Sequence, residues 1–113
     1  MDSFVAALKS AGFEGEIDSS EESLQTYSHD ASLFEIKPQL IVAPKDPKAV
    51  ATLVDVASKL KKRLPNLSLT ARSGGTCMSG GAINDSVIVD FNKHLTAIES
   101  VTKSEGRTQP GVF

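Results

Sequence analysis

Ten consecutive residues in the second half of the chain concentrate the groups that could bind an anion. They include four of the eight glycines in the sequence and four hydroxyl or thiol side chains: Arg72, Ser73, Gly74, Gly75, Thr76, Cys77, Met78, Ser79, Gly80 and Gly81. Because glycine reaches positive φ and has no Cβ, successive backbone N–H groups can converge on one phosphate. We therefore expect this glycine-rich loop, residues 72–81, to bind a phosphate. The alternative is a mobile connection that binds nothing.

Two familiar phosphate-binding motifs do not fit the glycine-rich loop. Gly75 and Gly80 have the spacing of the Walker A motif, but Gly81-Ala82 stands where that motif needs Lys followed by Ser or Thr. The dinucleotide motif GxGxxG also fails, because Gly74 and Gly75 are adjacent. Both motifs lead into a helix, whereas the apolar run after this loop predicts a strand. A phosphate would have to be held by the loop's own N–H groups and by the side chains of Arg72, Ser73, Thr76 and Ser79.

The other reactive side chains form no catalytic or metal-binding pattern. Cys77 could be a redox thiol, but a lone cysteine is more often a small packed hydrophobe, and we favour that second interpretation. His29 and His94 lack the partners that would make them a base or a ligand, so we expect surface or hydrogen-bonded roles. Asp90 lies among apolar strand residues and is expected to supply edge polarity or to accept a hydrogen bond from a loop amide. The sequence nominates no catalytic residue and no metal ligand.

The composition limits the class of protein. The chain has 113 residues, which suffices for one domain with a modest core. Its net charge is −2, its basic cluster is confined to Lys59–Arg63 and it has one tyrosine, so nucleic-acid binding is not expected. Its apolar runs reach about five residues, far short of the roughly 20 that span a bilayer. We expect a cytoplasmic protein, and the apolar turn-and-strand pattern of residues 109–113 leads us to expect a truncated chain.

The N-terminal part of the chain is expected to be a helical lead-in. Asp2 or Ser3 can cap a first helix with one apolar face, which is expected to end near Gly12. Ser19 and Glu22 have the spacing of a capping box and predict a short second helix.

The middle of the chain predicts a βαβ unit. The run Leu40–Ala43 is typical of a buried strand, which Pro44 ends. Asp46 as N-cap and Pro47 at the first helical position open an amphipathic helix, and residues 67–71 alternate as a second strand. Strand, helix and strand over about 30 residues imply parallel pairing with a right-handed crossover. The expected inner face of the helix consists of Val50, Leu53, Val54, Ala57, Leu60 and Leu64.

Further strands are expected after the glycine-rich loop. Residues 87–91 and 97–101 are apolar enough for strands, and residues 104–106 predict a hairpin turn. The predicted fold class is α+β. It contains an α/β-like βαβ unit, further strands and a hairpin, with helices packed on a small mixed sheet.

Several motifs, taken in order, resemble the FAD-linked oxidases. The segment Tyr27–Ser32 is similar to a Tyr-Ser-x-Asp-Ala-Ser segment of that family. The glycine-rich loop is similar to its Arg-x-Gly-Gly-Thr-Ser-x-Ser-Gly-Gly pyrophosphate loop, with Cys77 in place of a serine. The segments Leu40–Asp46, 87–91 and Gln109–Val112 follow the family's order. The resemblance is to the N-terminal half of the FAD-binding domain of the vanillyl-alcohol oxidase or p-cresol methylhydroxylase (PCMH) type. It is strongest to the branch of D-lactate dehydrogenase, D-2-hydroxyglutarate dehydrogenase and glycolate oxidase.

The resemblance implies FAD as the cofactor. It implies that the amides of Gly74–Ser79 wrap the FAD pyrophosphate. Family members with a covalent flavin carry a histidine where Thr76 stands, so noncovalent FAD is implied. The residues implied to lie against the cofactor at the end of the chain are Pro110, Gly111 and Val112.

The same resemblance implies that the chain is part of a larger enzyme. Residues 1–113 correspond to the N-terminal part of the FAD-binding domain, with the lead-in at 1–37 and the βαβ unit, loop and later strands at 38–113. The second FAD subdomain and the substrate domain are absent. The implied full-length enzyme oxidises a 2-hydroxy acid of the D-lactate, glycolate or 2-hydroxyglutarate type. An iron–sulfur partner or domain, and a peripheral position at the inner face of a membrane, are left open.

The chain by itself is expected to be inactive, to bind FAD poorly and to self-associate through an incomplete apolar face. The sequence is also compatible with two other classes of protein. The first is a stand-alone phosphate- or nucleotide-binding module without redox activity. The second is a structural or interaction domain whose loop binds nothing. ADP binding at least as tight as FAD binding would favour the module, and no ligand-induced shift in melting temperature would favour the structural domain.

Overall fold

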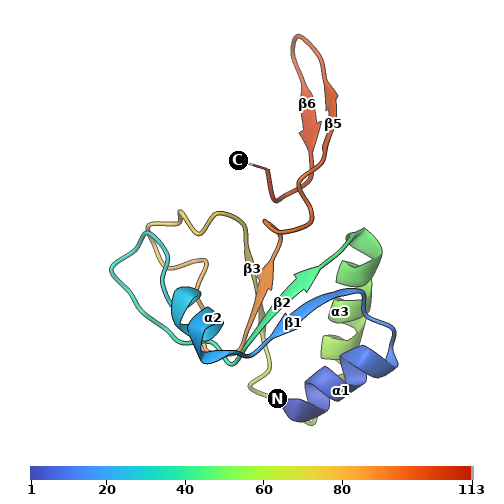
Figure 1. The fold of residues 1–113 in the computed structure, drawn as a ribbon, viewed down its shortest axis with the longest axis vertical. Coiled ribbons are helices and arrows are strands. Elements are labelled where there is room, and N and C mark those ends of the chain that lie inside the picture. The colour runs from blue at the N-terminus through green and yellow to red at the C-terminus, as the bar shows by residue number, and fades with distance from the viewer. Residues whose placement is uncertain (113) are drawn as a thin grey trace.

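The computed structural model describes residues 1–112, and Figure 1 shows how its helices and strands are arranged. Phe113, the last residue of the apolar tail considered above, lies outside the described residues. The elements follow one another in the order α1 (Asp2–Ser10), β1 (Gly15–Asp18), α2 (Glu21–Thr26), β2 (Leu40–Pro44), α3 (Pro47–Leu60), β3 (Leu69–Arg72), β4 (Val87–Asp90), β5 (Ile98–Val101) and β6 (Gly106–Thr108).

Four strands form one mixed sheet in the order β1-β2-β4-β3. β1 runs antiparallel to β2, and β4 runs parallel to both β2 and β3. β2 and β3 therefore share a direction, as the βαβ pattern predicts, but the expected direct pairing is wrong because β4 lies between them. β4 is buried along its whole length and fits the centre, whereas β3 is partly exposed and fits an edge. The expected α+β class with a small mixed sheet is confirmed.

The long helix α3 starts as predicted and presents a narrower apolar face than predicted. Asp46 is its N-cap, accepting a hydrogen bond from a first-turn amide at 2.8 Å, and Pro47 follows in the first turn. Val54, expected inside, is 53% exposed, because a residue next to Leu53 lies about 100° further around the helix. The buried residues of the helix are Ala49, Leu53, Val56 and Leu60.

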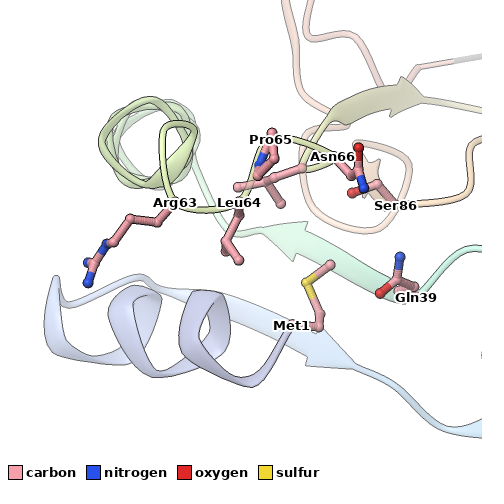
Figure 2. Close-up of a pocket in the computed structure, with 8 residues that line it drawn as sticks. Met1, Gln39, Arg63, Leu64, Pro65, Asn66 and Ser86 are labelled. Carbon is pink, nitrogen blue, oxygen red and sulfur yellow. The ribbon is translucent and has the colours of Figure 1, made fainter.

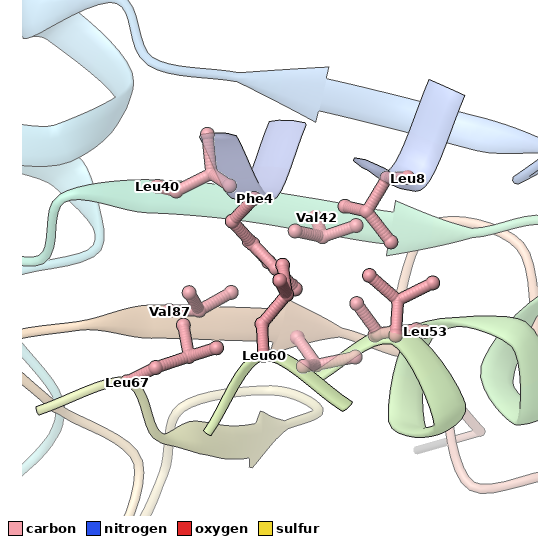
Figure 3. Packing of buried hydrophobic residues seen from close by; sticks show 10 residues of the cluster. Phe4, Leu8, Leu40, Val42, Leu53, Leu60, Leu67 and Val87 are labelled. Atoms are coloured by element: carbon pink, nitrogen blue, oxygen red, sulfur yellow. The ribbon is translucent and has the colours of Figure 1, made fainter. Parts of the chain in front are cut away.

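The core lies between the sheet and the two helices α1 and α3. Figure 3 shows Phe4 and Leu8 of α1 reaching toward β2 and α3, and both side chains are fully buried. Burial of side chains of this size contributes about 1.5–3 kcal/mol each. The buried residues of this cluster are Phe4, Leu8, Leu40, Val42, Leu53, Val56, Leu60, Leu67, Val87 and Val89.

The first two helices begin differently from the predicted caps. α1 is preceded by Met1, which makes no side-chain capping bond, so the expected polar cap is wrong. α2 is capped by Ser20, whose hydroxyl accepts from the amide of Ser23 at 3.4 Å, one residue later than the expected cap Ser19. Asp18, at the end of β1, accepts from the amide of Ser20 at 2.8 Å. The strand β1 thus fixes the start of α2, and through it the segment that follows.

β5 and β6 form a separate two-stranded sheet, which Figure 1 shows projecting away from the rest of the molecule. The predicted hairpin turn is confirmed: the amide of Thr102 donates to the carbonyl oxygen of Glu105 at 2.6 Å. Ile98 and Val101 on this hairpin are 63% and 75% exposed. The hairpin is therefore packed much less than the main sheet.

Candidate cofactor-binding site

The glycine-rich loop begins at the last residue of β3 and leads, through residues 82–86, into β4. It therefore starts at the carboxyl end of a parallel strand, the edge at which open α/β sheets bind ligands. Gly75 and Gly80 have φ values of 68° and 83°, which residues with a Cβ rarely adopt. A Cβ on Gly75 would also lie 2.5 Å from Nη2 of Arg72. The backbone conformation therefore favours glycine at position 75, and an added Cβ would force the Arg72 guanidinium to move.

Most backbone amides of the loop have no acceptor among the residues that the structure describes. Within residues 1–112, the N–H groups of residues 73–80 donate no hydrogen bond to an oxygen of the protein, and the Ser79 amide is close enough to the Cys77 sulfur to help lower the pKa of that thiol. The next two amides, of Gly81 and Ala82, donate to the Cys77 thiol at 3.3 Å and to the Asp30 carboxylate at 3.4 Å. Most of the loop lines an open cavity of about 280 Å³. An unbroken run of donors is thus available to a ligand or to water.

Arg72 connects the start of the loop to the segment Tyr27–Ser32. Its Nη1 donates to the carbonyl oxygen of His29 at 2.6 Å, and makes longer contacts to the carbonyls of Tyr27 (3.5 Å) and Ala82 (3.4 Å). Its Cζ lies 5.0 Å from the centroid of the Tyr27 ring, within cation–π range. The guanidinium therefore bonds to the protein itself, and the predicted phosphate contact of Arg72 stays a prediction.

The segment Tyr27–Ser32 also contacts the middle and the far end of the loop, and Figure 1 shows the two segments side by side. The amide of Ala31 donates to the carbonyl oxygen of Gly75 at 3.1 Å. Asp30 accepts from the Ser32 amide at 2.8 Å, the expected local turn, and its other oxygen accepts from the loop's far end. Hydrogen bonding from Ser32 lowers the pKa of Asp30, which keeps the carboxylate an acceptor. The segment serves as a scaffold for the loop.

Tyr27 is held in turn by Asp90, the last residue of β4. The Tyr27 hydroxyl donates to the carboxylate of Asp90, a residue that is 3% exposed. The other carboxylate oxygen accepts from the amides of Asn92 at 2.7 Å and Lys93 at 3.3 Å, which confirms the expected bond to loop amides. Burial, followed by the bond to Asp90, raises the pKa of Tyr27 far above its usual range, so the phenol stays a donor. The pairing joins residues 63 positions apart, and no sequence motif indicates it.

The remaining side chains of the loop lie at the surface. Thr76, Met78 and Ser79 are exposed, and Ser73 and Cys77 are half-buried. The Cys77 sulfur lies 3.2 Å from the Ser79 hydroxyl, and this hydrogen bond lowers the pKa of the Cys77 thiol. Cys77, expected to pack as a small hydrophobe, is instead half-buried and lines the open cavity of the loop.

The C-terminal candidates lie against the turn that follows β4. The amide of Gly111 donates to the carbonyl oxygen of Leu95 at 2.7 Å, and a Cβ on Gly111 would collide with the carbonyls of Phe91 and Leu95. Gly111 is buried, whereas Pro110 is exposed and Val112 is half-buried. Because β3 and β4 are parallel and adjacent, this turn starts at the same sheet edge as the glycine-rich loop. The fold therefore brings both parts of the predicted site to one edge.

The two histidines are exposed and each lies near one glutamate. Nε2 of His29 lies 3.3 Å from Glu35, and Nε2 of His94 lies 3.3 Å from Glu16. In the part of the chain that the structure describes, no three His, Cys, Asp or Glu residues are grouped to hold a metal ion. No helix in that part is long and apolar enough to cross a bilayer.

A separate cavity of about 170 Å³ lies at the opposite edge of the sheet (Figure 2). Gln39 and Ser86, which line it, come just before β2 and β4, so the cavity lies at the amino ends of the parallel strands. The glycine-rich loop starts at the carboxyl end. This cavity is therefore not part of the candidate site.

Comparison with known proteins assigns the class of this domain. The chain belongs to the FAD binding domain family, which matches residues 38–112. The matched region contains the βαβ unit, the whole glycine-rich loop and the C-terminal candidates. FAD, the cofactor implied by the sequence motifs, is thereby confirmed as the cofactor of this family of domains.

Curated relatives of the chain are D-2-hydroxyglutarate dehydrogenases. The chain is 32% identical over 112 residues to the enzyme of Escherichia coli (strain K12), covering 97% of this chain and 11% of the relative. It is 32% identical over 107 residues to that of Haemophilus influenzae, covering 93% of this chain and 10% of the relative. The chain thus spans about a tenth of the length of the curated relatives it matches.

Solved structures share the fold. Alkyldihydroxyacetonephosphate synthase superposes with a TM-score of 0.77 at 22% identity, covering 99% of this chain and 23% of that protein. 4-Ethylphenol oxidase from Gulosibacter chungangensis superposes with a TM-score of 0.72 at 15% identity, covering 98% of this chain and 22% of that protein. The expected likeness to the FAD-binding domain of the PCMH-type oxidases is confirmed.

Proposed function

We propose that the glycine-rich loop binds the pyrophosphate of FAD through the backbone amides of Gly74–Ser79. The observation that carries this proposal is the run of amides at residues 73–80 that have no oxygen acceptor among the described residues. A pyrophosphate offers only acceptor oxygens at neutral pH, and an array of N–H donors at a glycine-rich turn matches it. The hydroxyls of Ser73, Thr76 and Ser79 add donors on the same loop.

The fit to FAD is supported by the backbone shape. Gly75 and Gly80, at positive φ, keep the main chain open to close approach of a ligand. We further propose that Pro110, Gly111 and Val112 lie against the same cofactor, because they pack on the turn after β4, which starts at the same sheet edge as the loop. From the sequence we propose that FAD is bound noncovalently, because Thr76 stands where family members with a covalent flavin carry a histidine.

We infer that the chain is the N-terminal part of the FAD-binding domain of a flavoenzyme that oxidises a 2-hydroxy acid. The names of the curated relatives, all D-2-hydroxyglutarate dehydrogenases, support the D-2-hydroxyglutarate type. Bound FAD would supply the two-electron chemistry by accepting a hydride from the α-carbon while a base removes the hydroxyl proton. The part of this chain is to bind and orient the cofactor, and we propose no catalytic residue within it. The chain alone is therefore expected not to catalyse oxidation of a 2-hydroxy acid.

Calorimetric titration of the chain with FAD, ADP and ATP tests the proposal. We expect FAD to bind more tightly than ADP, with ligand concentrations reaching the millimolar range because the site is partial. ADP binding as tight as FAD binding would instead favour a nucleotide-binding module. Oxidation of D-lactate or D-2-hydroxyglutarate by the chain with added FAD would contradict the inactive-part proposal.

A variant that adds a negative charge to the loop tests where FAD binds. Ser79→Asp places a carboxylate beside the proposed pyrophosphate, and repulsion between like charges at short range is expected to weaken FAD binding at least about tenfold. Ser104→Asp adds the same charge on the exposed hairpin turn and is the matched control. Equal FAD affinity in both variants would remove the loop from the site.

A further inference from the structure

We propose that Arg72 is a positioning residue, which holds the glycine-rich loop in its binding shape, and that it does not act by pairing its charge with the phosphate. The proposal rests on the proposed function above for the identity of the ligand. It assigns to the segment Tyr27–Ser32 the role of a scaffold that Arg72 locks to the loop.

The guanidinium of Arg72 joins separate parts of the backbone by hydrogen bonds. Nη1 of Arg72 reaches carbonyl oxygens on both sides of the loop: those of Tyr27 and His29 in the scaffold and that of Ala82 after the loop. One planar group therefore connects the end of β3, the scaffold and the far end of the loop. All three contacts come from Nη1, which carries two N–H groups, so the 2.6 Å bond to His29 is the strongest of them. Lysine would have to make this bond without the planar guanidinium that lies over the Tyr27 ring, so it is a poor substitute at this site.

The guanidinium of Arg72 also packs against the Tyr27 ring and the loop backbone. The guanidinium lies near the Tyr27 ring, and a Cβ on Gly75 would come within 2.5–3.0 Å of three of its atoms. The loop backbone thus rests directly against Arg72. Tyr27 is itself anchored by the buried carboxylate of Asp90. A continuous series of contacts thus connects Asp90, at the end of the central strand β4, through Tyr27 and Arg72 to Gly75.

The amide array depends on this arrangement. The carbonyl oxygen of Gly75 is taken by the amide of Ala31, so the peptide that contains it is oriented by the scaffold. With the backbone fixed in this way, the amides of residues 73–80 have no oxygen acceptor in the described part of the chain and are available to a ligand. A loop that is already ordered avoids the entropy cost of ordering on binding. Arg72 would therefore raise FAD affinity through the shape of the loop.

Two substitutions separate shape from charge. Arg72→Lys keeps the positive charge and loses the planar group, whereas Arg72→Gln loses both. If Arg72 positions the loop, both variants are expected to lose FAD affinity by a similar factor, about tenfold, since bonds to a charged donor are lost in each. Arg107→Lys and Arg107→Gln on the exposed hairpin are matched controls, expected to leave FAD affinity unchanged.

The test combines calorimetric FAD titration with amide NMR spectra of the free chain. We expect the loop resonances of both Arg72 variants to move without ligand, while those of β2 and α3 keep their positions. A purely structural role would lower the melting temperature without moving loop resonances in the folded state. An Arg72→Lys variant that keeps the loop spectrum and FAD affinity, beside an Arg72→Gln variant that loses affinity, would overturn the proposal. Moved loop resonances in a chain that never binds FAD would support positioning and refute the proposed function.

Discussion

Gly75→Ala is predicted to be the most informative single substitution in the glycine-rich loop. Gly75 has a φ of 68°, and an alanine in this left-handed region costs about 1–2 kcal/mol. The new Cβ would also lie 2.5 Å from Nη2 of Arg72. Because the end of a flexible side chain can move, we expect the guanidinium to give way and to lose its bond to the His29 carbonyl. A hydrogen bond from a charged group contributes about 1.5–3 kcal/mol.

The sum of the two costs is about 2.5–5 kcal/mol of unfolding free energy, from 1–2 plus 1.5–3. Gly12→Ala is a natural control, because Gly12 has a φ of 76° and nothing within 4 Å of its added Cβ. That variant should lose only the conformational part, about 1–2 kcal/mol. Urea denaturation followed by circular dichroism measures both values.

A double-mutant cycle completes this prediction. In an Arg72→Gln background the guanidinium is gone, so Gly75→Ala should cost about as much as Gly12→Ala. The contact between Arg72 and Gly75 would be refuted if Gly75→Ala and Gly12→Ala destabilised the unsubstituted chain equally.

Three further predictions follow from single contacts. Gly111→Ala should destabilise the turn after β4 by more than 1 kcal/mol, as measured by urea denaturation, because its Cβ would collide with backbone carbonyls; Gly106→Ala, with a 3.9 Å contact, should change stability little. Tyr27→Phe leaves the buried Asp90 carboxylate without one donor and should cost about 1–3 kcal/mol in the same assay, and an unchanged midpoint would contradict the bond. The pKa of Asp30 is lowered in the folded chain, so the Asp30 carboxylate stabilises the fold above the unfolded pKa of about 3.9. This stabilisation is lost as the pH falls through the lower folded pKa. Melting temperatures between pH 5 and pH 2 should show the loss in the unsubstituted chain and less of it in Asp30→Asn.

The elements with strong local signals could be predicted from the sequence. The strand β2 is a continuous apolar run, and α3 has its N-cap, its proline and a helical period all in agreement. The hairpin β5–β6 follows from its turn residues. β1 was not predicted, because Ile17 is its one apolar side chain. Strand order was not predictable either, because the residue patterns of β2, β3 and β4 specify direction but not which strand lies between the others.

The candidate site shows the same division. The glycine-rich loop could be identified from composition and spacing, and the family match confirms the cofactor. The scaffold role of Tyr27–Ser32 could not, because its contacts to Arg72 and Asp90 join residues 45 and 63 positions apart. Local patterns cover only a few residues at a time. A partner so distant in sequence is determined by packing of the whole sheet.

Hydrogen–deuterium exchange of residues 73–80, with and without FAD, tests most directly the claim that main-chain amides hold the pyrophosphate. Amides without a protein partner exchange rapidly in the free chain. The account predicts that saturating FAD, and more weakly ADP, slows exchange in this stretch, whereas riboflavin, which lacks the pyrophosphate, does not. Unchanged exchange at residues 73–80 with FAD bound, or protection confined to the opposite cavity at Gln39 and Ser86, would contradict it.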